Sequence, residues 1–130
     1  MPDYGLSKQL DVDFDQARQL VQAALAGEGF GVLSEIDLAG TLNAKLGRQL
    51  SPQVILGACN PVLADRALQA EPSIGLLLPC NVVVRAEGEG SSVVEIVNPD
   101  IMVNLTHSPA VAAVAAEARR RLQAVLDSLG

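Results

Sequence analysis

Aromatic residues are almost absent from this chain. It has no tryptophan, one tyrosine and two phenylalanines among 130 residues, although 49% of the residues are hydrophobic. The core must therefore be built from Ala, Val, Leu and Ile, which suits helices that lie close to a sheet. The hydrophobic content and the charged fraction of 18% exclude a disordered chain. We expect a single domain that covers residues 1–130.

Basic residues are also scarce. Nine lysines and arginines stand against fifteen acidic residues, which gives a formal net charge of −6. Nucleic-acid-binding proteins usually carry a basic face, because phosphate contacts dominate their affinity. The one basic run, Arg119–Arg121, follows Glu117 at helical spacing and is expected to pair with it locally. We therefore expect no nucleic-acid partner.

Long apolar runs are missing as well. The longest nearly apolar stretch, residues 74–84, contains Pro79 and Asn81 and is too short to span a bilayer. The chain does not begin with a basic segment followed by an apolar one, as a secretory signal would. We therefore expect no membrane partner and a cytoplasmic location, where cysteines normally stay reduced.

The hydrophobic pattern predicts an α+β fold. Segments 4–10, 30–36, 53–59, 76–86 and 92–97 read as strands. The two main helices are expected to begin after the caps Asp13 and Ser108, and shorter helices are expected over 38–46 and 60–70. The order β-α-β(4)-α predicts a mostly antiparallel, curved sheet. One face is covered by two main helices, with short helical insertions between strands.

Each of the two cysteines precedes an asparagine. In Cys59-Asn60, the asparagine is typical of a helix N-cap, and the proline that follows favours the same start. Cys59 would then lie at the positive end of a helix, where cysteine pKa values are often lowered. A small buried residue without chemistry is the alternative. No cap explains Cys80-Asn81, and Pro79 before it indicates a sheet edge or a bulge.

If the third and fourth strands are neighbours, the two sulfurs lie close together. Three interpretations are open: buried neighbours without chemistry, the lining of a ligand pocket, or a redox or metal pair. A zinc or copper site needs three or four ligands. His107 is the only histidine and no C-x-x-C spacing exists, so Cys59 and Cys80 are the only metal-ligand candidates that stand out. We predict no cofactor.

Three charged residues gather around the second strand and the short helix after it. Glu35 is expected on the face opposite Val32 and Ile36. Asp37 is placed to cap the short helix, and Lys45 lies in its last turn, where the helix dipole favours it. Capping and solvation explain these charges. In a cleft near the thiols, however, Glu35 would be a candidate proton acceptor.

Two segments, GFGVLSEIDLAGTLNAKLG and VILGACNPVLADRALQAEPSIGLLLPCNVVV, resemble the domain-of-unknown-function family 302. The similarity runs from Phe14 to Met102 and is most specific in the GACNP and LLPCNVVV blocks. The resemblance implies a TATA-binding-protein-like fold and a homodimer, without an established activity. At its motif positions it singles out Glu35, Asp37, Lys45, Cys59, Asn60, Pro61, Pro79 and Cys80.

From these observations we predict a cytoplasmic homodimer that binds a small molecule or a protein partner, rather than an enzyme. Its ligand-binding residues would be Glu35, Asp37, Lys45, Cys59, Asn60, Cys80 and Asn81. One alternative is a thiol-dependent redox protein or enzyme with Cys59 as the nucleophile. A second is a metal-handling protein that uses both thiols. All three depend on neighbouring third and fourth strands that bring the thiols to one pocket.

Overall fold

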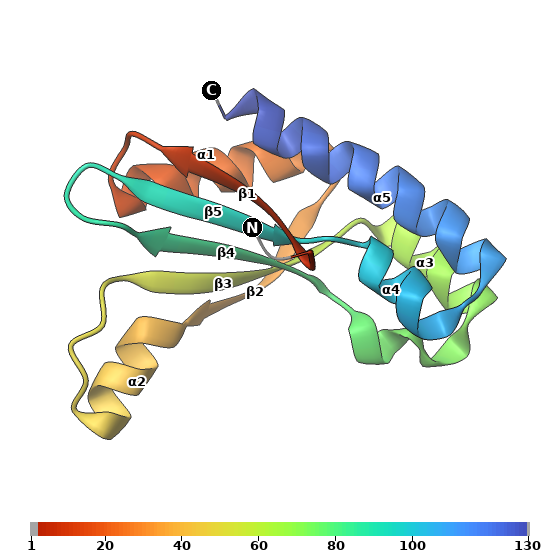
Figure 1. Cartoon of the computed structure of the whole chain (residues 1–130), viewed down its shortest axis with the longest axis horizontal. Coiled ribbons are helices and arrows are strands. Elements are labelled where there is room, and N and C mark those ends of the chain that lie inside the picture. The colour runs from red at the N-terminus through yellow and green to blue at the C-terminus, as the bar shows by residue number, and fades with distance from the viewer. Residues whose placement is uncertain (1–2, 130) are drawn as a thin grey trace.

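The computed structural model describes residues 3–129, which form a five-stranded sheet with strand order β1-β5-β4-β3-β2. Every neighbouring pair is antiparallel, which confirms the predicted α+β class. The elements are β1 (Gly5–Leu10), α1 (Phe14–Gly27), β2 (Gly31–Asp37), α2 (Leu38–Leu46), β3 (Gln53–Cys59), α3 (Pro61–Ala70), the 3₁₀ helix η1 (Pro72–Leu77), β4 (Cys80–Ala86), β5 (Ser92–Val97), α4 (Asp100–Thr106) and α5 (Pro109–Ser128). Figure 1 shows the twisted sheet and the two long helices.

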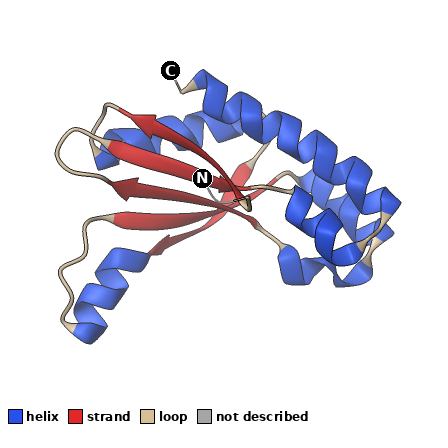
Figure 2. Ribbon diagram, viewed as in Figure 1, coloured by secondary structure: helices blue, strands red, loops and turns tan. Residues whose placement is uncertain are grey.

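One face of the sheet packs against α1 and the second half of α5 (Figure 2). Antiparallel partners point to the same side of a sheet. A row of buried side chains therefore crosses it from Leu6 through Ile96 and Val82 to Leu56. Ala17, Val21 and Leu25 of α1 bury the facing stripe. The small alanine lets the helix lie close to the strands, as the lack of aromatic residues requires.

A second apolar cluster lies beyond one end of the sheet. It joins α3, η1 and α4 to the first half of α5. These helices lie on the right of Figure 1. Val111, Val114, Ala115 and Ala118 serve this cluster, whereas Leu122 serves the core on the sheet. The single long helix α5 therefore ties the two clusters together. Over the described residues 3–129, no helix is long and apolar enough to cross a membrane.

The structure corrects the predicted fourth strand. Residues 72–77 form η1 instead of extended chain, and β4 begins at Cys80. Ile74 is buried in the second cluster, so its apolar character reflects helix packing rather than a strand. Pro79 comes directly before β4, after a cis peptide bond, and no bulge forms there. Helix α4 is a second difference, because the sequence pattern predicted no helix between the hairpin and α5.

The structure also corrects the face on which Glu35 lies. The β2–β3 register shifts between Val32 and Ser34, which makes Leu33 the extra residue of a β-bulge. One added residue reverses the alternation of side chains that follow it. Glu35 therefore pairs with Leu56 on the helix-covered face, the same face as Val32. The prediction that placed Glu35 opposite Val32 is wrong.

Candidate functional site

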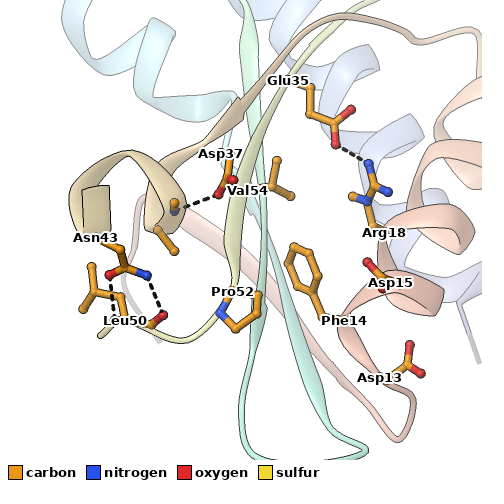
Figure 3. Close-up of a pocket in the computed structure, with 12 residues that line it drawn as sticks. Asp13, Phe14, Asp15, Arg18, Glu35, Asp37, Asn43, Leu50, Pro52 and Val54 are labelled. Carbon is orange, nitrogen blue, oxygen red and sulfur yellow. Dashed lines mark hydrogen bonds and ion pairs between the residues drawn. The ribbon is translucent and has the colours of Figure 1, made fainter. Parts of the chain in front are cut away.

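An open cleft of about 710 Å³ lies between α1 and the β2–α2 segment. Phe14, Asp15 and Arg18 of α1 face Glu35 and Asp37 of β2 across it (Figure 3). Its floor includes the start of β3, and Asn43 and Leu50 line it on the α2 side. We call this cavity the acidic cleft. Its charged lining consists of Asp13, Asp15, Arg18, Glu35 and Asp37.

The bulge in β2 creates the acidic cleft. Because it turns Glu35 to the helix-covered face, Asp37, two residues on, points the same way. Asp37 lies opposite Val54 of β3, at the end of the sheet where α1 begins. Two carboxylates therefore occupy positions that apolar residues fill on the neighbouring strands.

One ion pair crosses the acidic cleft. Arg18 Nη1 donates to Glu35 Oε1 at 2.5 Å, and this bond raises the pKa of Arg18 above its ordinary value. Within residues 3–129, Arg18 Nε is the fully buried side-chain nitrogen that lacks a hydrogen-bond partner. Four carboxylates line the cleft against this one guanidinium, so the cleft carries a net negative charge.

Two of these carboxylates also organise the backbone. Asp13 accepts from the backbone N–H of Gln16 at 2.8 Å and Asp37 from that of Gly40 at 2.9 Å, so each caps the helix that follows it. Both caps were predicted. Because a cap holds its side chain in place, these carboxylates present a fixed charge to the cleft.

The α2 wall is held by one side chain that the sequence did not single out. Asn43 accepts from the backbone N–H of Leu50 at 2.8 Å and donates to its carbonyl at 3.2 Å. This pair of bonds clips the loop between α2 and β3 onto the helix. Sequence reasoning also missed Asp15 and Arg18, whose position opposite β2 depends on the bulge. The only signal was the three-residue spacing of Asp15 and Arg18, which places both on one face of a helix.

The two thiols line a second, much smaller cavity. Strands β3 and β4 are neighbours, as predicted, and Ala58 lies opposite Cys80. Cys59 and Cys80 are free, and both border a cavity of about 30 Å³ together with Phe30, Leu63 and Met102. We call it the thiol cavity. This volume corresponds to about two water-sized spheres, so no larger ligand fits without rearrangement.

Burial keeps Cys80 protonated at neutral pH. It raises the pKa of the Cys80 thiol to about 11, with a smaller contribution from the neighbouring Cys59. Ionising Cys80 near neutral pH therefore costs about 3 kcal/mol more than ionising an ordinary thiol. Within residues 3–129, no three His, Cys, Asp or Glu side chains are grouped as a metal site requires.

The predicted site residues therefore occupy separate places. Cys59, Cys80 and Asn60 border the thiol cavity, and Asn60 also caps α3 by accepting from the backbone N–H of Leu63. Glu35 and Asp37 line the acidic cleft. Asn81 lies opposite Gly57, on the sheet face away from α1. Lys45 is exposed in α2 and borders neither cavity.

The open antiparallel sheet, its two covering helices and the helical group at one end define the class of the protein as α+β. The chain belongs to the family described as "Domain of unknown function DUF302", whose model matches residues 6–129. This confirms the resemblance and extends it toward both termini. The crystal structure of the uncharacterized conserved protein DUF302 from Bacillus stearothermophilus is similar, with a TM-score of 0.90 and 29% identity. The alignment covers 99% of this chain and 100% of that one. Among curated proteins, none matches the chain.

Proposed function

We propose that this protein is a small-ligand-binding module and that its ligand occupies the acidic cleft. The volume of the cleft carries the proposal. At about 710 Å³ it falls within the range of about 300–1,000 Å³ that is usual for small-molecule sites. The thiol cavity, at about 30 Å³, falls far below that range.

The charges of the cleft favour a cationic ligand, such as a small amine or guanidinium compound. Asp15 and Asp37 offer carboxylate oxygens that can accept from an ammonium group, and such charge-assisted bonds are stronger than neutral ones. The ring of Phe14 lies beside them and can contact the same cation with its face. Arg18 is already paired with Glu35, so it leaves the remaining carboxylates uncompensated.

The alternatives that use the thiols have weaker support. Cys59 is partly exposed and directly precedes the N-cap of α3, which agrees with the predicted position of a reactive cysteine. Its partner Cys80, however, is buried and its thiol has a raised pKa. Besides the thiol cavity, Cys80 borders a cavity of about 280 Å³ with Asn81, which is smaller than the usual small-molecule site. The binding proposal therefore uses the cleft and assigns the thiols to packing.

We also propose that the protein acts as a homodimer, as the family resemblance implies, and that it works in the cytoplasm, as the sequence pattern predicts. Light scattering tests the dimer directly. The expected mass is twice the chain mass of 13.5 kDa, and a mass of 13.5 kDa would contradict the dimer.

Calorimetry with 1,4-diaminobutane tests the cleft. We expect saturable binding that weakens about tenfold or more in the double variant Asp15→Asn, Asp37→Asn, because two charge-assisted bonds are lost. The control Asp65→Asn, Glu71→Gln removes the same charge from α3 and its C-cap, outside the cleft, and should bind like the unaltered protein. Equal weakening in both variants would mean that only the net charge matters and would reject the site.

A further inference from the structure

A third cavity, of about 480 Å³, lies where α3 begins. Three parts of the chain enclose it: the turn between α1 and β2 at Gly29, the first two turns of α3, and the middle of α5. We call it the α3 niche. It borders neither Glu35 nor Asp37, so a ligand bound in the niche would not touch the acidic cleft.

The niche gathers hydrogen-bond donors. Arg66 and Val62 are four residues apart on α3, so they lie on one face of the helix, and both line the niche. Arg66 forms no hydrogen bond or ion pair with the rest of residues 3–129. Arg121 enters from α5, where it donates to Glu117 and to the carbonyl oxygen of Glu28. The N-terminus of a ten-residue helix adds its partial positive charge.

Asn60 supplies a second, separate indication of a ligand. Its side chain is only 7% exposed, and its oxygen is used by the Leu63 cap. Its amide nitrogen Nδ2 has no hydrogen-bond partner within the described part of the chain, yet it lies at the wall of the niche, against Gly29. Because Nδ2 is not fully buried, it opens into the niche, where an acceptor on a ligand can replace water as its partner.

Gly29 keeps this space open. Its φ of +82° favours glycine. A Cβ there would lie 3.0 Å from Asn60 Nδ2 and 3.3 Å from Arg121 Nη1. A side chain at position 29 would therefore crowd both donors and strain the backbone.

The one carboxylate in the niche is already neutralised. Glu117 accepts from Arg120 and Arg121, and these bonds lower the pKa of its carboxyl to about 2. It therefore stays ionised and keeps Arg121 in place, while Arg66 remains uncompensated. We propose that the α3 niche binds the phosphate group of a small ligand, held by Arg66, Arg121, Asn60 Nδ2 and the first free N–H of α3.

Titration followed by amide NMR and calorimetry tests this proposal with two probes, inorganic phosphate and glycerol 3-phosphate. We expect saturable binding that perturbs the amides of residues 29 and 60–66. Arg66→Gln and Asn60→Ser should each weaken it by about tenfold, since each removes a donor to a charged group. Serine still caps a helix, so Asn60→Ser should leave α3 intact. If glycerol 3-phosphate binds more tightly, the ligand is an organic phosphate. If both bind alike, the ligand is the free ion.

Arg119→Gln provides the matched control. It removes the same charge from α5, but Arg119 lies outside the niche, at 3.7 Å from Asp100. Binding should be unchanged in this variant. The proposal is overturned if neither probe binds saturably at millimolar concentration, or if Arg119→Gln weakens binding as much as Arg66→Gln. Because these probes are anions and that of the acidic cleft is a cation, either proposal can fail without the other.

Discussion

The acidic cleft and the thiol cavity lie at opposite ends of the same strand, β3. Val54, near its start, lines the cleft, whereas Ala58 and Cys59 at its end line the thiol cavity. At one end the strand is roofed by α3, α5 and the residues before β4, which leaves about 30 Å³. At the other end a bulge turns two carboxylates inward, and about 710 Å³ stays open.

This difference separates two roles within one sheet. The apolar side chains around the thiol cavity contribute to stability, because folding removes them from water. The charged groups of the open cleft contribute little to stability, because they are nearly as well solvated in the folded protein as in the unfolded chain. Substitutions around the thiol cavity should therefore destabilise the protein. Those in the acidic cleft should mainly change binding, with at most a local loss of stability where a helix cap is removed.

The largest effect is expected from Leu63→Ala. Leu63 is 5% exposed and borders the thiol cavity, so its truncation enlarges that cavity. The free energy of unfolding should fall by about 2–5 kcal/mol in urea denaturation. Leu68→Ala, on the same helix but 44% exposed, is the control and should cost less than about 1 kcal/mol. Similar losses in both variants would contradict the idea that burial beside the thiol cavity determines the loss.

A somewhat smaller effect concerns alkaline pH. The pKa of the Cys80 thiol is raised from 9.0 to about 11, so between these values the folded protein keeps a proton that the unfolded chain has lost. This contribution to stability is complete below pH 9 and disappears as the pH rises toward 11, a loss of about 3 kcal/mol.

Denaturation curves at pH 8 and pH 11 measure this loss. Cys80→Ala should lack it, whereas Cys59→Ala should keep most of it, because burial is the main cause of the raised pKa. Subtracting the curves of a variant from those of the unaltered protein removes the titration of all other groups. A loss that survives in Cys80→Ala would mean that another group is responsible.

The smallest effect concerns the cleft itself. Asp37→Ala removes the N-cap bond to Gly40, which should destabilise α2 by about 1 kcal/mol. Because α2 buries only Ala39, we expect the loss as faster hydrogen exchange in residues 40–46 rather than as global unfolding. Asp37→Asn keeps a cap without the charge. It should restore slow hydrogen exchange in residues 40–46, while 1,4-diaminobutane still binds weakly. If Asp37→Asn also restored diamine binding, the charge of Asp37 would not be needed for the ligand.

The sequence predicted well those elements whose start or pairing depends on one local pattern of residues. Asp13, Asn60 and Ser108 each cap the expected helix, because a side chain that reaches its own first turn needs no tertiary contact. The pairing of β3 with β4 was also correct. Six of its seven residues, all except Gln53, are apolar, which fits a strand that is buried between two neighbours.

The acidic cleft could not be predicted, because it depends on a single extra residue. Nothing in GVLSEID marks Leu33 as bulged, and regular alternation places Glu35 on the wrong face. In α2, Leu38, Leu42 and Leu46 have the spacing of a buried helix face. Only Ala39 is buried, however, since α2 projects away from the body of the sheet (Figure 1). The bulge in β2 and the exposure of α2 both follow from long-range packing, about which the hydrophobic periodicity of the sequence gives no information.

The position of β1 has a consequence for biosynthesis. Gly5 lies opposite Val97 in the sheet, and Lys8 Nζ donates to the carbonyl of Leu126 at the far end of α5, 118 residues away. A ribosome releases the start of the chain first. Strand β1 must therefore wait without its partner until β5 has emerged. Closure of the sheet's β1 edge should be among the last steps of folding, and premature termination anywhere before β5 leaves that strand permanently exposed.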